Sequence, residues 1–298
     1  MANTFIQGKN GPAGITGATY SLAYNSNVTV GNLLIAEWGH LTSSVSSVTD
    51  SLGVNGNWNV VYDTSDGAGY IGGWAWMFTK ASGACTVNVN LAASSGGGRI
   101  EIAEENGPTA LRATAAANVI VNGTAQPSNS NTVSATAGDW LIGFFSSGTG
   151  NTLSAAPPWV LRAQSDANPN ALNAMQDTDA AGGSTFTSFN GSSTNARVCG
   201  LGAFYAATFN ISGGTGVAGA TVNYSGPASG SVTADGSGNY TIPVSANGTF
   251  TITPSKSGFA FSPSSQAVNM VSANVTGINF TGSVQTTTHT QLRHWRGN

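Results

Sequence analysis

One run of closely spaced acidic residues stands out in the sequence: Glu101, Glu104 and Glu105. Paired carboxylates are the groups that glycoside hydrolysis requires. Side chains alternate along a strand, so Glu101 and Glu105 lie on the face opposite Glu104, and no facing pair is predicted. Glu104 shares its face with Ile100 and Ile102. This predicts an inward carboxylate bonded to loop amides, and a raised pKa there would make it a functional candidate.

Histidine chemistry has few candidates. His40 is the only histidine outside the C-terminal stretch, which holds His289 and His294. No Gly-x-Ser-x-Gly motif precedes a helix, as an α/β-type serine hydrolase would require. His40 comes at the end of a predicted strand, and we expect it in a surface or loop position. We therefore predict no catalytic residue, no zinc site and no enzyme activity.

Aromatic residues are the candidates for binding. By strand alternation, Trp74 and Trp76 share one face, with Tyr62 and Tyr70 nearby in the sequence. Exposed, such a strip would stack against sugar rings; buried, it would be ordinary core. Apolar neighbours on the opposite face leave both interpretations open. Our candidate ligand-binding residues are Trp74, Trp76, Tyr70 and Tyr62.

Oxygen-rich loops suit a calcium ion. Two such places are Asp63 with Ser65 and Asp66, and Asp177 with Asp179. The alternation of Asp235, Ser237 and Asn239 superficially resembles a calcium loop, but it lacks the closing bidentate glutamate, and a hairpin turn explains it. We expect no cofactor, with structural calcium as the remaining possibility.

Two cysteines, Cys85 and Cys199, each lie in an apolar strand pattern. They are too few for a disulfide framework or for a zinc site of their own. Two interpretations remain: buried free thiols, or a bridge between two strands of one sandwich.

The composition indicates a folded β protein of an extracellular setting. Only 7% of the residues are charged, 40% are hydrophobic, and 40 are glycine. The few scattered basic residues form no patch for a phosphate backbone, so no nucleic-acid partner is expected. No apolar stretch is long enough to insert into a membrane. Residues 1–8 lack the features of a secretion signal, so either a signal has been removed or the protein leaves the cell another way, for instance in a virion. The expected location is extracellular or on a virion surface.

Short apolar runs separated by Gly, Ser, Asn and Pro predict an all-β fold. We expect residues 1–207 to form a jelly-roll-like β-sandwich. Its strands are predicted at 28–38, 45–49, 58–62, 73–80, 86–91, 99–104, 119–121, 132–135, 140–145, 159–162, 173–177, 185–189 and 198–205.

A weak internal similarity relates two of these strands. The segment 30–36 resembles the segment 137–143, since each places a Gly-Asn or Gly-Asp turn directly before an apolar run. A continuous apolar run is typical of a strand buried on both faces. We expect the two segments to be equivalent central strands.

A new and regular alternation begins after Tyr205. Apolar residues recur at every second position in 220–224, 240–244 and 250–252, with polar residues between them. This pattern predicts half-buried strands of a second sandwich over residues 208–283. Asp235-Gly236-Ser237-Gly238-Asn239 supplies a hairpin turn. Residues 284–298 fit neither domain and are expected to form a flexible tail.

The second domain resembles the carboxypeptidase regulatory-like domain. The resemblance is carried, in order, by segments 211–213, 216–222, 235–240, 251–259, 261–263 and 275–282. It implies a prealbumin-like or immunoglobulin-like sandwich of seven strands. Such domains are spacers or adhesive modules of bacterial secreted and surface proteins, and they carry no catalytic residues.

The first domain has a looser resemblance. Val48-Thr49-Asp50-Ser51-Leu52-Gly53, followed by Trp58, and Arg99–Glu104, followed by Asn106-Gly107, are similar to motifs of uncharacterised β-sandwich domains. These domains occur in secreted and phage-borne bacterial proteins. Here Glu105 replaces an aromatic residue that is common in that group, and Val54-Asn55-Gly56 lengthens one loop. The resemblance implies architecture only.

These observations favour a non-enzymatic structural or adhesive protein of a cell surface, an extracellular appendage or a phage virion. The second domain would act as a spacer or interaction module. Expected partners are other copies of the chain, neighbouring structural proteins, or glycans. The alternative function is that of a carbohydrate-binding module in a secreted protein.

Overall fold

A computed structural model describes residues 3–12, 14–65, 69–115, 118–120, 128–147, 153–164, 172–191 and 197–285. Strands and turns make up this part of the chain, which confirms the predicted all-β sandwich class. None of it forms a helix long and apolar enough to cross a membrane. The chain forms two compact units, with the main division between Thr208 and Phe209, next to the predicted boundary; the short segments Ser245–Gly248 and Asn269–Ser272 also belong to the first unit.

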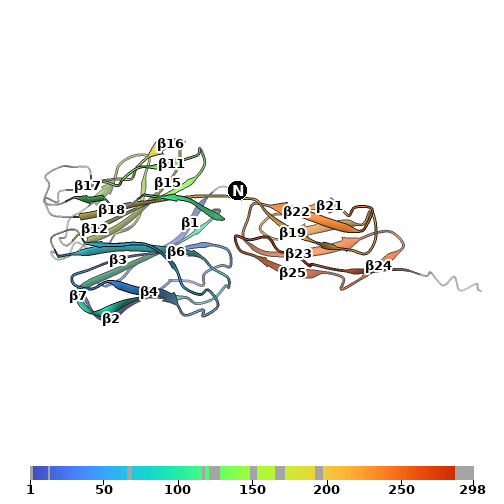
Figure 1. The fold of residues 1–298 in the computed structure, drawn as a ribbon, viewed down its shortest axis with the longest axis horizontal. Coiled ribbons are helices and arrows are strands. Elements are labelled where there is room, and N and C mark those ends of the chain that lie inside the picture. Colours follow the sequence, from blue (N-terminus) through green and yellow to red (C-terminus); the bar gives the residue numbers. More distant parts are fainter. Residues whose placement is uncertain are drawn as a thin grey trace, which may run out of the picture. The chain divides into compact units, whose positions relative to one another are not determined.

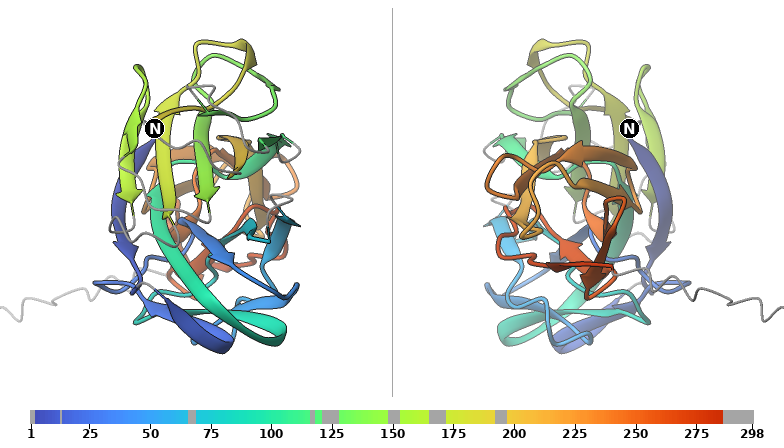
Figure 2. Two further views of the ribbon diagram at one scale, coloured as in Figure 1. Left: turned by 90° about the vertical axis from the view of Figure 1, so that its left-hand side faces the viewer. Right: turned by 90° about the vertical axis from the view of Figure 1, so that its right-hand side faces the viewer.

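The first half of the first unit is a sandwich of two sheets. One sheet has the order β1-β7-β3-β6-β5, and β2 and β4 flank the other end of β7 to form the second. Strand β7 is long enough to serve both sheets, and Figure 2 shows it bending from one to the other. The strands are β1 (Thr4–Asn10), β2 (Ile15–Ala23), β3 (Leu33–His40), β4 (Val45–Asp50), β5 (Asn59–Ser65), β6 (Ile71–Phe78) and β7 (Thr86–Asn106).

The second half of this unit contains three further sheets. The largest has the order β14-β15-β12-β18-β8, with β9 also on β18; the smaller ones are β10-β17-β13 and β11-β16. The strands are β8 (Ala110–Thr114), β9 (Asn118–Ile120), β10 (Ser128–Asn129), β11 (Val133–Ala135), β12 (Trp140–Ser147), β13 (Leu153–Ala155), β14 (Val160–Gln164), β15 (Leu172–Asp179), β16 (Gly183–Thr185), β17 (Ser188–Gly191) and β18 (Arg197–Tyr205).

The two halves repeat one topology. Read from its other edge, the sheet β8-β18-β12-β15-β14 follows the order β1-β7-β3-β6-β5 strand for strand. The small sheet β10-β17-β13 likewise matches β2-β7-β4. The similar segments 30–36 and 137–143 therefore belong to equivalent central strands, because β3 lies between β7 and β6, and β12 lies between β18 and β15. The first unit consists of two sandwiches of the same design rather than one.

Irregularities in the strand pairing recur at equivalent places. On β5 the register shifts between Val60 and Tyr62, and on β14 it shifts between Leu161 and Ala163. A β-bulge is a specific local feature that bends a strand, so a coincidence of position supports a common design. The edge strands β1 and β8 also carry matching shifts, opposite the C-terminal ends of β7 and β18.

The turn before each central strand is also repeated. Gly31 and Gly138 have φ angles of 90° and 87°. In this left-handed region a side chain is strained, which explains the glycine in both copies. The next residue closes each turn, with Asn32 N donating to Thr29 O at 3.1 Å and Asp139 N donating to the equivalent carbonyl of Thr136 at 3.0 Å.

The sheets of the first unit stack in layers, which follow one another in Figure 1 from β2 and β4, through β3 and β6, to β12 and β18, and then to β11, β16 and β17. One core lies inside the first sandwich and includes Trp38 and Val87. A second lies between the two largest sheets. Others fill the second sandwich. Every residue of β3 and β12 is buried because both faces of each strand are covered.

The second unit is a smaller sandwich. Its sheets are β21-β20-β23-β25, β19-β22 and β24-β26. The predicted alternation is confirmed, since Val222, Ile242 and Phe250 are buried while their neighbours are exposed. The eight strands are β19 (Phe209–Gly214), β20 (Thr221–Ser225), β21 (Gly230–Thr233), β22 (Asn239–Val244), β23 (Gly248–Ser255), β24 (Phe259–Ser262), β25 (Gln266–Met270) and β26 (Thr281–Val284). Most of the predicted tail, residues 286–298, lies outside the described residues.

Candidate functional site

The predicted aromatic strip is part of the core between the two largest sheets. Trp74 is fully buried, and its ring stacks on Phe144 of β12 at 4.1 Å between centroids. Trp76 is partly buried and meets Phe204 of β18 edge-on at 5.4 Å. The opposite face of β6 is also buried, with Met77 in the core of the first sandwich. Of the two interpretations of the strip, core is therefore the one that the structure supports.

The two tyrosines of the strip belong to the same interior. Tyr70 is buried, and burial raises its pKa above the usual value. Tyr62 is partly buried, packs edge-on against Trp74 at 6.5 Å, and has a pKa raised well above its ordinary value, first by burial and then by Glu37. Trp74, Trp76, Tyr70 and Tyr62 therefore do not form an exposed platform. Their aromatic area stabilises the contact between the two sandwiches.

Glu104 has the structural role that the sequence predicted. Its carboxylate accepts hydrogen bonds from Thr29 N at 2.9 Å, Asn32 Nδ2 at 2.6 Å and Gln7 Nε2 at 2.5 Å. These donors come from β1 and from the turn before β3. A buried carboxylate with this many donors is stabilised in place. Glu104 therefore fastens the turn that precedes the central strand.

The carboxyl groups that do approach one another involve a residue that the sequence analysis did not single out. Glu37 on β3 is directly opposite Glu101 on β7, and both are buried on the face toward the second sandwich. Burial raises the pKa of Glu37 well above its usual range, and Glu101 adds to this shift. A single acidic residue inside the apolar run 33–38 was the available signal.

A second carboxyl pair joins the two sandwiches. Glu105 of β7 faces Asp177 of β15, and burial, followed by the negative charge of Asp177, raises the pKa of Glu105 well above its ordinary value. Arg162 Nε donates to Asp177 Oδ2 at 2.6 Å. Glu105 and Asp177 are each 1% exposed, so solvent does not reach this pair. Groups held in this way contribute to packing and hydrogen bonding.

The sequence analysis expected His40 in a surface or loop position. This expectation was wrong, because His40 is fully buried. Its Nε2 lies 3.5 Å from Asp63 Oδ1, and its ring meets Tyr20 edge-on at 6.1 Å. Burial alone would raise the pKa of Asp63. Bonds from His40, Trp38 and the amide of Val45 outweigh this effect and lower the pKa below its usual value.

The proposed calcium loops have other roles where they are described. Asp63 and Asp177 are occupied by the contacts above, and Asp66 lies outside the described residues. Asp235 Oδ1 accepts from Ser237 N at 2.8 Å and Asn239 N at 2.9 Å, as a hairpin turn requires. Within the described ranges, no three His, Cys, Asp or Glu residues gather as metal ligands.

Both cysteines are free and buried. Cys85 belongs to the core of the first sandwich and Cys199 to a core of the second, so they lie in different hydrophobic clusters. Burial raises the pKa of each thiol to about 12. The buried-thiol interpretation is the correct one, and both groups are poor nucleophiles.

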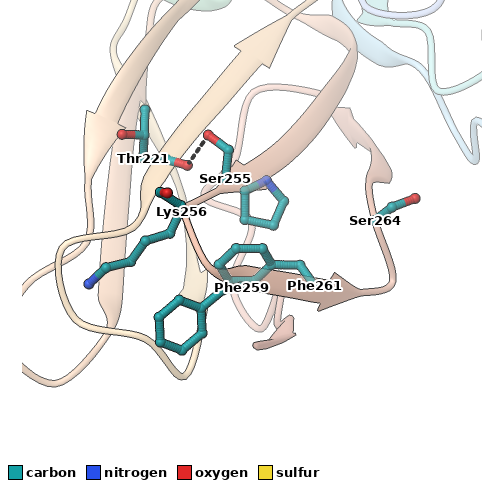
Figure 3. A pocket seen from close by; sticks show the side chains of 8 residues that line it. Thr221, Ser255, Lys256, Phe259, Phe261 and Ser264 are labelled. Carbon is teal, nitrogen blue, oxygen red and sulfur yellow. Dashed lines mark hydrogen bonds between the residues drawn. The ribbon is translucent and has the colours of Figure 1, made fainter. Parts of the chain in front are cut away.

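One surface hollow lies in the second unit, beside β20, β23 and β24 (Figure 3). It has a volume of about 440 Å³. Lys256 is the only charged residue of the lining, and its Nζ donates to Ala218 O and lies 5.6 Å from the ring centroid of Phe259. In Figure 3 its side chain extends away from Phe261 and Ser264. The ammonium group is thus engaged by the protein itself.

A second hollow, of about 420 Å³, lies in the second half of the first unit. It is uncharged and combines two prolines, two aromatic residues and hydroxyl groups. The sequence analysis did not single out any of these residues for binding. The lining consists of Ala156, Pro157, Pro158, Trp159, Ser184, Thr185, Phe186 and Ser188.

Comparison with known proteins does not place the chain in a family. No protein-family model matches it. No curated protein matches it. Among solved structures, it is similar to the Bacillus anthracis TIE protein with a TM-score of 0.26 and 8% sequence identity, over 95% of this chain and 41% of that chain. The chain thus spans less than half of that structure, and a likeness at this level supports no functional argument.

Proposed function

We propose that the chain is a non-enzymatic structural or adhesive protein of a cell surface, an extracellular appendage or a phage virion. Its second unit would act as a spacer or interaction domain. The residue types that could do chemistry, namely the aromatic strip and the paired carboxyl groups, support this proposal because they fasten one sandwich to the other. Self-association or contact with neighbouring structural proteins is the activity to test.

The observation that carries the proposal is an uncharged polar face on the sheet β2-β7-β4. Ser21 Oγ donates to Asn88 Oδ1 at 2.7 Å, and Thr19 Oγ1 donates to Asn90 Oδ1 at 3.1 Å. Asn90 Nδ2 continues this ladder to Ser47 Oγ at 3.1 Å. Such a face can be covered by another protein without burying a charge, which is the costly step in forming an interface.

The test is the state of assembly of the full chain. Light scattering and negative-stain microscopy are expected to show ordered oligomers or filaments at high protein concentration. The variant Ser21→Arg/Asn88→Arg places two positive charges on the face and is expected to dissociate them. Val54→Arg/Asn57→Arg, which places the same two charges at exposed positions of the loop before β5, is the matched control and should leave assembly intact. A protein that stays monomeric at every concentration would contradict the self-association proposal.

A further inference from the structure

The two sandwiches have tryptophans at equivalent positions, but the connections that precede these tryptophans differ in length. Trp58 directly precedes β5, and Trp159 directly precedes β14. In the first sandwich the connection before the strand covers residues 51–58, and Trp58 Nε1 donates to Asp50 Oδ2 at 3.0 Å. In the second sandwich the connection is only residues 156–159, and prolines stand before the tryptophan. Both tryptophans are buried, with 4% of Trp58 and 9% of Trp159 accessible, but Trp159 also forms part of the wall of a surface hollow.

Phe186 is the exposed aromatic residue of this hollow, with 45% of its surface accessible. Its neighbour Thr187 is fully buried and firmly held. Thr187 N donates to Ser130 Oγ at 3.0 Å, and Gln176 Nε2 donates to Thr187 Oγ1 at 2.7 Å. The backbone next to Phe186 is therefore fixed, while nearly half of the residue's surface stays accessible. Phe186 thus holds a defined place in the wall of the hollow, as a binding residue on a rigid element does.

The chemistry of the lining selects the class of ligand. Proline and aromatic rings offer flat apolar area, and Ser184, Thr185 and Ser188 add hydroxyl groups around it. A pyranose ring has the complementary surface, with apolar C–H faces and hydroxyl edges. No lining residue is charged, so the ligand is neutral. The volume of about 420 Å³ is within the range of small-ligand pockets. A proline-rich peptide would use the rings, but its proline residues offer carbonyl acceptors and no N–H donors, whereas a hexose offers both donors and acceptors to the hydroxyl groups.

We propose that the hollow lined by Pro157, Pro158, Trp159 and Phe186 binds a neutral hexose unit of a glycan. This inference names a ligand for the adhesive branch of the proposed function, and it rests on that branch. The two can fail separately, because assembly is measured through the face of β2-β7-β4 and glycan binding through this hollow.

The experiment uses the full chain on an array of neutral oligosaccharides: glucans, mannans, galactans and xylans. The strongest binder is then titrated in solution by tryptophan fluorescence. We expect a subset of the neutral hexose oligosaccharides to bind. Phe186→Ala is expected to weaken binding about tenfold with little change in the melting temperature, because the lost aromatic stacking is worth roughly this factor. Trp159→Phe, which preserves the buried part of the ring, is expected to weaken binding and to shift the fluorescence response.

Val160→Ala is the matched control, since Val160 is adjacent, 46% exposed and not part of the lining. It should bind as the unchanged protein does. Absence of binding to every glycan would overturn the proposal, and so would an unchanged affinity of Phe186→Ala. Binding of a polyproline peptide in place of the saccharides would also overturn it. If Phe186→Ala folds and assembles but no longer binds the glycan, glycan binding depends on this hollow and is independent of assembly.

Discussion

The two sandwiches of the first unit have one backbone design but different side chains at equivalent positions of the faces that meet. Because Leu33 pairs with Glu105 and Trp140 pairs with Phe204, the two central strands can be aligned residue by residue. The buried acidic position Glu37 then corresponds to Phe144, and Glu105 corresponds to Phe204. The strand order is kept while the side chains on the facing surfaces differ.

This difference has a physical reason. If Glu37 and Glu105 were repeated at the equivalent positions of the second sandwich, further carboxyl groups would be buried in the same interior, and like charges in a low-dielectric interior are strongly disfavoured. Phe144 and Phe204 stand at these positions and supply large apolar area in place of two more carboxyl groups. The contact between Trp74 and Phe144 is the centre of this arrangement. Duplication of the fold thus required divergence of the surfaces that pack.

The largest effect is expected from breaking this contact. Trp74→Ala removes a fully buried indole from between the sheets and should lower the free energy of unfolding by about 3–5 kcal/mol. Chemical denaturation measures the change. Val160→Ala, on the exposed surface, is the control and should stay within about 0.5 kcal/mol of the unchanged protein. If both variants were equally stable, the sandwiches would not be held together by this core.

A smaller effect is expected from the loop that only the first sandwich has. Asp50 binds Trp58 Nε1, the amide of Leu52 and the side chain of Asn55. Asp50→Ala leaves these donors without their acceptor and should cost about 1–3 kcal/mol in denaturation experiments. Asp50→Asn keeps one acceptor oxygen and should lose less. An unchanged stability of Asp50→Ala would show that the hydrogen bonds of this carboxylate do not hold the long loop in place.

The smallest effect on stability is expected from Glu37→Gln at acidic pH. Glu37 is then protonated in both the folded and the unfolded state, so its replacement by the neutral Gln changes little. The pKa of Glu37 is raised in the folded protein, so the folded state keeps a proton that the unfolded chain releases above about pH 4.3. This contribution to stability is complete below that pH and is lost as the pH rises toward the folded pKa. Other titratable groups near Glu37 are Glu101, Tyr62, Tyr70 and Cys199.

Gln cannot ionise, so the stability of Glu37→Gln relative to the unchanged protein should rise as the pH is raised above about 4.3, the pKa of Glu in the unfolded chain. Denaturant unfolding at several pH values measures this slope. Thr241→Ala, at an exposed position and without loss of an ionisable group, is the control and should leave the slope unchanged. A difference between Glu37→Gln and the unchanged protein that is constant with pH would mean that Glu37 is ionised in the folded state.

Several local features could be predicted because they depend on neighbouring residues only. The alternation of Val222 and its neighbours, the turn at Asp235 and the inward direction of Glu104 were each correctly predicted. Strand β7 was predicted as two strands, 86–91 and 99–104, because Ala-Ala-Ser-Ser-Gly-Gly-Gly lies between them. The structure continues the strand through this segment, since Ser95 and Gly98 pair with β2. Pairing with a distant strand overrode the local preference.

The sequence by itself determined the all-β class, the equivalence of the two central strands and the regular alternation of the second unit. Alternation, turn glycines and apolar runs act over a few residues and can be seen without the fold. Only the tertiary structure decided the role of the aromatic strip. Strand β6 carries Trp74 on one face and Met77 on the other, and both faces are covered by other sheets. Without a polar side, alternation cannot indicate what faces solvent, so the stacking of the layers settled it.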